Sequence, residues 1–158
     1  MTVARRALLG LPLAAWGWDA QAGAQVEEPL ADSVRSALSA AISAAPPPRP
    51  HFDDIEQRLA FLRWQGTASD RLRRYKSDGH ARVEFLNTVW YESRRAGLEA
   101  ALVLGLIQVE SAFRKYAISV VGARGYMQIM PFWSRLIGDG DPARLFHMQT
   151  NLRFGCVI

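Results

Sequence analysis

The chain has 158 residues, of which 49% are hydrophobic and 22% are charged. This length suits one domain, and the composition is that of a folded protein with a buried core, which excludes a disordered chain. The formal net charge of +4 favours an anionic partner, and the single cysteine, Cys156, excludes an internal disulfide and a cysteine-rich metal site.

The first 24 residues resemble an export signal. Arg5 and Arg6 precede the apolar run ALLGLPLAAWGW, and the small-residue stretch AQAGA follows, which is typical of a signal-peptidase site. The apolar run is shorter than a bilayer requires, so a membrane anchor is the less favoured interpretation. We therefore expect residues 1–24 to be a signal peptide and the mature chain to be exported to the periplasm or cell envelope, without an integral membrane span.

Residues 25–52 are rich in alanine and serine and end in a proline run, APPPRP. Prolines at this density forbid a helix and favour an extended chain, so we interpret the segment as a tether. A short helix over DSVRSALSAAIS is also compatible with the pattern, because Val34, Leu38, Ala41 and Ile42 share one face. Such a helix would be marginal in isolation.

The folded domain is predicted to occupy residues 53–158 and to be all-α, because no later stretch shows the alternation of a strand. Asp53 or Asp54 can cap its first helix, whose apolar face is expected to consist of Ile55, Leu59 and Leu62.

The segment DRLRRYK, residues 70–76, concentrates four basic side chains, Arg71, Arg73, Arg74 and Lys76. Two interpretations stay open for it. It is either a solvated face, which is the commoner case, or a surface that attracts an anionic polymer.

A second helix is predicted over residues 81–96, with Gly97 as its C-terminal stop. Its apolar stripe is expected to contain Val83, Leu86 and Trp90, with Phe85 and Val89 beside it.

The third helix, predicted over residues 99–113, contains an acid in an apolar setting. Along this helix the acid is surrounded by Leu102, Val103, Leu106, Ile107, Val109 and Phe113. Residues three and four apart share a helix face, so Glu110 is expected to point with Leu106 and Phe113 toward the core. Burial there would raise the carboxyl pKa and suit a general acid. A buried glutamate paired with an arginine is an equally good interpretation from this helix alone.

The next segment, YAISVVGARGYMQIMPFWSRLIG, combines features of a ligand-binding loop and a helix start. Gly122 and Gly125 allow a tight turn and a close approach of backbone to a ligand. Gln128 offers a donor and an acceptor that suit a sugar amide or hydroxyl, although a Met-Gln-Ile-Met run is also compatible with an ordinary core. Pro131 is well placed for the first turn of a helix that ends near Gly138.

Three segments in this order carry a family resemblance: ESAF at residues 110–113, GARGYMQIMP at 122–131 and NLRFG at 151–155. Together they resemble the SLT-type soluble lytic transglycosylases, which cleave the glycan strand of peptidoglycan. The resemblance covers about residues 82–158. It implies a mainly helical, lysozyme-like fold of the goose-type lysozyme and SLT class, with a groove for the substrate.

The resemblance also implies roles for individual residues. Glu110 matches the catalytic acid of the family. In the family, certain positions line the substrate groove near the N-acetyl groups of the sugar; in this chain they correspond to Ser119, Gln128 and Met130. The rest of the family motif corresponds to Gly122, Gly125 and Met127. Ser111, next to the acid, is expected to orient the carboxyl group.

Most glycosidases use two carboxyl groups, whereas this chain offers one obvious acid. Asp139 and Asp141 in GDGDP fit a loop capped by its own aspartates better than a calcium loop. The resemblance implies a substrate-assisted reaction, in which Glu110 protonates the β-1,4 bond between N-acetylmuramic acid and N-acetylglucosamine and then accepts the proton of the C6 hydroxyl, forming a 1,6-anhydro end.

The expected partner is the peptidoglycan glycan strand, not nucleic acid, and no cofactor is expected. The three histidines, His51, His80 and His147, are too scattered to predict a metal site. Two alternatives remain: a muramidase of the same fold that hydrolyses the bond, and a catalytically impaired wall-binding or scaffold protein.

The chain departs from the family pattern at three places. Tyr126 stands where leucine is common, and Val120 stands where proline is common. The family also has a downstream segment of Ala-Tyr-Asn type, and the chain stops at Ile158 before any such segment. The last residues resemble the start of a helix capped by Thr150 or Asn151, so we expect a domain whose C-terminal part is missing.

Overall fold

The computed structural model describes residues 26–43, 50 and 52–158. The predicted signal peptide and most of the proline run lie outside this part of the chain. The helices are α1 (Asp32–Ser43), α2 (Ile55–Leu72), α3 (Gly79–Arg95), α4 (Ala100–Ser111), α5 (Phe132–Ile137), the 3₁₀ helix η1 (Pro142–Phe146) and α6 (Met148–Val157). Within the described ranges there is no strand, only isolated bridges that join Arg124 to Ile118 and Ile129. The predicted all-α class is confirmed.

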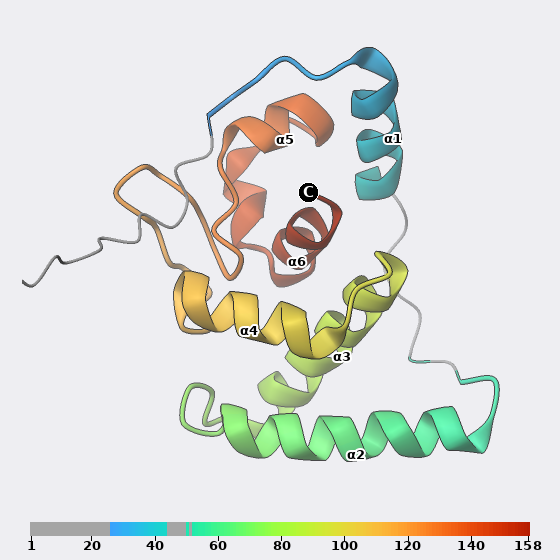
Figure 1. Cartoon of the computed structure of the whole chain (residues 1–158). Coiled ribbons are helices and arrows are strands. Elements are labelled where there is room, and N and C mark those ends of the chain that lie inside the picture. Colours follow the sequence, from blue (N-terminus) through green and yellow to red (C-terminus); the bar gives the residue numbers. More distant parts are fainter. Residues whose placement is uncertain (1–25, 44–49, 51) are drawn as a thin grey trace, which may run out of the picture.

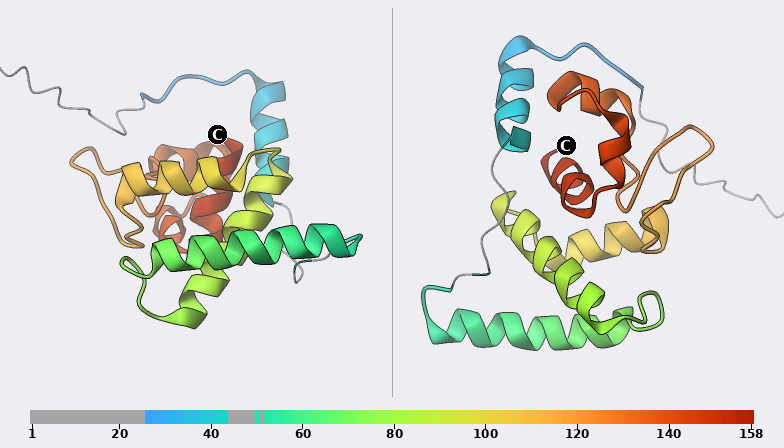
Figure 2. Two further views of the ribbon diagram at one scale, coloured as in Figure 1. Left: turned by 60° about the horizontal axis from the view of Figure 1, so that its bottom comes forward. Right: turned by 180° about the vertical axis from the view of Figure 1, so that it is seen from behind.

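The helix α3 is central to the arrangement, because it packs against α2, α4 and α6. In Figure 1, α2 lies at one end of the molecule, and α1, α5 and α6 gather at the other end. The same order is visible from behind in the right panel of Figure 2. The core between them contains Phe85, Leu86, Val89, Ile107 and Leu152, all with 0% exposure.

Aspartates and glycines set the helix boundaries largely as the sequence predicts. Asp54 caps α2, with its side chain accepting from the Gln57 N–H at 2.7 Å. Asp78 does the same for α3, accepting from the Ala81 N–H at 2.6 Å, and α3 therefore begins at Gly79, two residues before the predicted start. Gly97 follows α3 with φ of 72°, a left-handed conformation that suits glycine.

The predicted apolar face of α2 is wrong. Ile55 and Leu62 are 61% and 47% exposed, and the buried residues of α2 are Phe61, Ala68 and Leu72. The reason is aromatic packing against α3, because the Phe61 ring lies 5.2 Å from the Trp90 ring. The α3 stripe is shifted in the same way: Val83 is 42% exposed, and Phe85 rather than Val83 faces the core.

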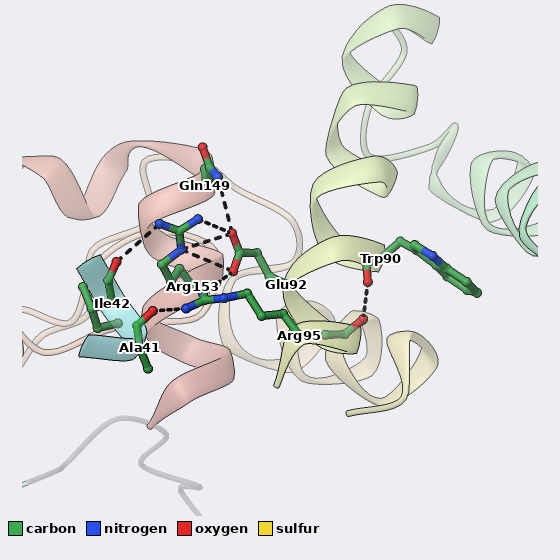
Figure 3. Close-up of polar contacts among 8 residues, drawn as sticks. Ala41, Ile42, Trp90, Glu92, Arg95, Gln149 and Arg153 are labelled. Carbon is green, nitrogen blue, oxygen red and sulfur yellow. Dashed lines mark hydrogen bonds and ion pairs between the residues drawn. The ribbon is translucent and has the colours of Figure 1, made fainter. Parts of the chain in front are cut away.

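The possible short helix over DSVRSALSAAIS, within the segment that we assigned to the tether, is present as α1, and it packs against α5 and α6. Leu38 and Ile42 are partly buried against the core. Two arginines of the domain also donate hydrogen bonds to the end of α1: Arg95 to the Ala41 carbonyl, and Arg153 to the Ile42 carbonyl at 3.3 Å (Figure 3). The division of the chain into signal, tether and domain stays a prediction.

A buried ion-pair cluster, defined by Glu92, Arg95 and Arg153, joins α3 to α6 (Figure 3). Glu92 is 1% exposed. Its carboxylate accepts from Arg153 Nη2 at 2.9 Å, from Arg95 Nη1 at 3.3 Å and from Gln149 Nε2 at 3.4 Å. A buried charge needs such partners, so removal of any arginine from the cluster would leave the carboxylate poorly compensated.

The predicted cap of the last helix is wrong. The helix α6 begins at Met148 with His147 before it, so Thr150 and Asn151 lie inside the helix. The helix prediction for Pro131 and Gly138 is confirmed, because α5 occupies the residues between them. None of the helices in the described ranges is long and apolar enough to cross a membrane.

Candidate functional site

The candidate acid, Glu110, lies in the last turn of α4, where the chain turns sharply. Ala112 and Phe113 follow with φ of 48° and 61°. Two successive non-glycine residues in the left-handed region are costly, and such conformations are concentrated at functional sites. The Phe113 ring holds this turn in the core, with its centroid 4.9 Å from the Tyr75 ring and 6.1 Å from the Phe85 ring.

The helix α4 is apolar on all sides, but only one side is covered. Val103, Ile107 and Ser111 are buried, whereas the other side exposes Leu102, Leu106 and Val109 at 63%, 42% and 77%. The expectation that Leu106 points into the core is therefore wrong. Glu110 lies at the border between the two sides, so its carboxyl group sits at the edge of the core and not within it.

The two carboxyl oxygens of Glu110 differ in their surroundings. The residue is partly exposed, yet Oε2 is shielded from solvent and has no hydrogen-bond partner among the described residues. This burial raises the pKa of Glu110 above the ordinary value for a glutamate. No arginine pairs with the group in the described part of the chain, so Glu110 is not the structural ion pair that was the alternative interpretation of this helix.

Ser111 does not orient the Glu110 carboxyl group as we expected. Its hydroxyl is 1% exposed and donates to the Tyr126 carbonyl at 2.7 Å, with the Ile107 carbonyl 3.1 Å away. A serine hydroxyl has a single hydrogen, which is used here on the backbone. Ser111 therefore ties the end of α4 to the glycine-containing loop.

Ser119 closes the tip of that loop. Its hydroxyl oxygen accepts from the Ala123 N–H at 3.0 Å, and its own N–H donates to the Ala123 carbonyl at 3.0 Å. Gly122, with φ of 87°, makes the turn between them, and its N–H donates to the Ser119 carbonyl. The tip projects outward, since Val120 is 99% exposed.

Gly125 fits where no other residue would. Its φ is 76°, and a Cβ atom there would lie 2.7 Å from the Leu145 carbonyl oxygen. The space is closed by Asn151, which is 1% exposed. Asn151 accepts from the Met127 N–H and donates to the carbonyls of Arg124 and Leu145, each at 2.8 Å. It thus holds the loop against α6 through three backbone groups.

Asn151 is the support that sequence reasoning missed, because we interpreted it as a helix cap. The available signal was a short amide side chain next to Leu152 in NLRFG, because an amide that becomes buried needs hydrogen-bond partners. Met127 packs against α6, the helix that carries Asn151. It is 5% exposed, and a Cβ atom on Gly155 of α6 would lie 2.7 Å from the Met127 Cβ atom.

Gln128 has both donor hydrogens engaged within the loop. It is 9% exposed with φ of 49°, and its Nε2 donates to the Gly125 carbonyl at 2.9 Å and to the Ala117 carbonyl at 3.3 Å. Both of these hydrogen bonds come from Nε2 and not from the amide oxygen. Met130 is half-buried beside it. In the described structure no hydrogen bond links Glu110 to Ser119 or Gln128.

The tyrosine at position 126 is accommodated by a lysine. Tyr126 is 3% exposed, and its hydroxyl accepts from Lys76 Nζ at 2.6 Å. Burial raises the pKa of Tyr126 to about 12. Burial, together with the nearby Lys115 charge, lowers the pKa of Lys76. Lys76 therefore faces inward beneath the loop, unlike the arginines that precede it in DRLRRYK.

The aspartates of GDGDP cap their own loop, as predicted. Asp139 accepts from the Asp141 N–H at 3.1 Å and pairs with Arg144, and Asp141 accepts from the Ala143 N–H at 2.9 Å. Within the described ranges, no group of three or more His, Cys, Asp or Glu side chains is arranged to hold a metal ion.

The C-terminal part of the chain is similar to known proteins. Residues 88–158 match the family model described as the Transglycosylase SLT domain. The membrane-bound lytic murein transglycosylase C of Actinobacillus pleuropneumoniae serotype 5b (strain L20) is 38% identical over 88 residues, which cover 49% of this chain and 24% of that protein. The protein of the same name from Mannheimia succiniciproducens is 46% identical over 80 residues, which cover 46% of this chain and 22% of that protein.

The chain thus spans about a quarter of the length of these curated relatives. No solved structure matches it significantly. The resemblance inferred from ESAF, GARGYMQIMP and NLRFG is confirmed over residues 88–158.

Proposed function

Taking residues 88–158 as an SLT-type lytic transglycosylase domain, we propose that the chain cleaves the β-1,4 bond between N-acetylmuramic acid and N-acetylglucosamine in peptidoglycan and leaves 1,6-anhydromuramic ends. The observation that carries this proposal is the Glu110 carboxyl group, whose Oε2 atom is shielded and unpaired among the described residues. The names of the relatives, which are murein transglycosylases, support the substrate.

In the first step, protonated Glu110 gives its proton to the glycosidic oxygen. The bond from this oxygen to C1 of the muramic sugar breaks, and N-acetylglucosamine leaves with a free hydroxyl. The N-acetyl group of the muramic sugar supports the positive charge that develops at C1. Burial raises the pKa of Glu110, so the proton is present at a higher pH than on an exposed glutamate.

In the second step, the same carboxyl group acts as a base. Glu110 takes the proton of the C6 hydroxyl, and the C6 oxygen bonds to C1, which closes the 1,6-anhydro ring. The proton given in the first step is thereby recovered, and water does not enter. One carboxyl group is sufficient for this sequence, in contrast to the pair that hydrolytic glycosidases commonly use.

The glycine-containing loop supplies the proposed substrate contacts. Ser111 and Asn151 fix its backbone through the hydrogen bonds at Tyr126, Met127 and Arg124. A fixed loop can present the Gln128 oxygen, Ser119 and Met130 to the N-acetyl groups without a large ordering cost. The exposed leucines of α4 next to Glu110 provide an apolar surface for the sugar rings.

A substrate in the cell wall implies an exported protein. We therefore extend the proposal to a location in the cell envelope, on the periplasmic side. The export signal predicted over residues 1–24 agrees with this location.

The test is digestion of purified peptidoglycan followed by mass spectrometry of the released glycans. The chain and a Glu99→Gln control should release anhydromuramic products, and Glu110→Gln should release none. Glu99 is a suitable control because it is exposed at the opposite end of the same helix and its side chain makes no capping hydrogen bond.

Three results would contradict the proposal. Undiminished cleavage by Glu110→Gln would show that another group is the acid. Reducing N-acetylmuramic ends would show a muramidase. Binding to peptidoglycan without cleavage by either the chain or the control would show a wall-binding protein.

A further inference from the structure

A concave site lies between α2 and α4. It is a groove of about 840 Å³, and we call it the α2–α4 groove. Its lining from α2 and the following turn runs from Trp64 to Tyr75, and its lining from α4 consists of Ala101, Leu104, Gly105 and Gln108. Figure 1 shows the two helices running alongside each other, both in contact with α3.

The groove and Glu110 lie on different sides of α4. Glu110 follows Ala101 by nine residues, which is about two and a half turns of an α-helix, so the two side chains point in opposite directions. The helix α2 also precedes the residues matched by the family model. The groove is therefore separate from the bond-cleaving site and does not depend on the proposed function.

The floor of the groove is apolar and its α4 wall is uncharged. Leu72, Ala68 and Phe113 form buried parts of the floor, and the rings of Trp64 and Tyr75 border it. A concave surface of this kind binds side chains that are removed from water, such as those of a peptide. A flat lipid surface fits such a concave floor poorly.

The rim of the groove is cationic. Arg71, Arg73 and Arg74 line it together with Asp70. Asp70 pairs with Arg73 at 2.9 Å, and in the described structure neither Arg71 nor Arg74 has a carboxylate partner. The Arg74 guanidinium instead lies 4.8 Å from the centre of the Tyr75 ring. Two uncompensated cations beside an apolar floor with low dielectric constant attract an anion strongly.

From this charge and shape we propose that the α2–α4 groove binds a short acidic segment of a partner protein, with apolar side chains on the groove floor and carboxylates at Arg71 and Arg74. From Trp64 to Leu72, where α2 ends, the groove follows the helix for about 12 Å, which accommodates about four extended residues. The segment DRLRRYK was interpreted either as a solvated face or as a surface for an anionic polymer. Under our proposal, Arg71 and Arg74 bind an anionic partner, whereas Lys76 lies beneath the loop and takes no part.

The test measures binding of a fluorescein-labelled peptide, in which glutamates flank two leucines, by fluorescence anisotropy with the full chain. We expect saturable binding that weakens as salt is added. A peptide with lysines in place of the glutamates and a peptide with serines in place of the leucines should both bind at least about tenfold more weakly.

Three variants locate the binding. Replacing Arg71 and Arg74 together with alanine should weaken binding about tenfold, because two exposed charge pairs are lost. Gly105→Phe should abolish it by filling the groove, and the fold should tolerate this change because a Cβ atom on Gly105 meets nothing within 4 Å. Arg63→Ala removes an exposed charge from α2 outside the groove lining and should leave the affinity unchanged.

Several results would overturn the proposal. Absence of peptide binding, or equal binding by the arginine variant and the parent chain, would remove the groove as a peptide site. If peptidoglycan fragments with peptide stems, or vesicles of anionic phospholipid, bind with the same dependence on Arg71, Arg74 and Gly105 while the peptide does not, the groove has a different occupant. Circular dichroism of each variant establishes that a loss of binding is not a loss of folding.

Discussion

Two partly or fully buried glutamates, Glu92 and Glu110, illustrate two uses of the same side chain. Glu92 is enclosed by Arg153, Arg95 and Gln149 and stabilises the contact between α3 and α6. Glu110 has one shielded oxygen without a partner among the described residues, at the end of a helix with a strained turn. The difference is that one carboxylate is bound by side chains from two helices, whereas the other keeps a shielded oxygen that no described residue contacts by a hydrogen bond.

The largest expected effect is on the rate of cleavage. Glu110→Gln keeps the shape of the side chain but cannot give or take a proton, so we expect at least about a 10³-fold loss of activity on peptidoglycan. The folded structure should be retained, as measured by circular dichroism and thermal unfolding. A comparable loss of activity in Glu92→Gln without a loss of stability would break the distinction between the two glutamates.

The next effect is on stability. Glu92→Gln leaves Arg153 and Arg95 without a carboxylate in a mostly buried site, and we expect the free energy of unfolding to fall by about 3–5 kcal/mol. Urea denaturation measures this change. Glu84→Gln on the exposed side of the same helix is the control and should change stability by less than about 0.5 kcal/mol. A Glu92 variant as stable as this control would contradict the structural role.

A smaller effect is expected at the link between the loop and α6. Asn151→Ala removes the side-chain partner of the Met127 N–H and of the Leu145 carbonyl, and one of the two hydrogen bonds to the Arg124 carbonyl, which should cost about 1–3 kcal/mol in urea denaturation. Cleavage should also slow, because the loop is released beside Glu110. The neighbouring Thr150→Ala serves as the control. If Asn151→Ala lost stability but retained the full rate, the loop would not position the substrate.

The smallest effect is a dependence on pH. Because burial raises the pKa of Glu110, the folded state holds this proton more tightly than the unfolded state does. The resulting stability is present below the unfolded pKa and is lost as pH rises through the folded pKa. Glu110→Gln should therefore gain thermal stability relative to the parent chain at pH 8 and not at pH 4.

The rate of cleavage should respond to the same proton. The first step needs protonated Glu110, so the rate should fall as pH rises through the raised pKa, above the range near pH 4.3 of an ordinary glutamate. A rate profile measured on peptidoglycan, with Glu99→Gln as the control for loss of one charge, checks this expectation. A profile without a decline on the alkaline side would contradict the acid role of Glu110.

The sequence predicted the helices well because their signals are local. Asp54, Gly97 and Pro131 act within one turn of their own positions, and each helix boundary that they predicted was found within two residues. The covered faces were predicted less well. The helix α4 is apolar on all sides, so its pattern does not distinguish Val103, which is buried, from Leu102, which is exposed.

The different surroundings of the two glutamates also depend on residues that are distant along the chain. Arg95 lies three residues from Glu92 and could be identified as a partner, but Arg153 lies 61 residues away. Likewise, the hydrogen bonds of Asn151 reach 24 and 27 residues back, to Met127 and Arg124. Such roles depend on how helices meet, and residue type alone does not specify them.

The attachment of α1 has a consequence for the order of folding. Arg95 and Arg153 reach the carbonyls at the end of α1 across 54 and 111 residues of chain. Contacts this distant form late, and a twelve-residue helix is marginal without them. We therefore expect α1 to dock last, after α3 and α6 have come together around Glu92, and to be the first segment to exchange its amide hydrogens with solvent.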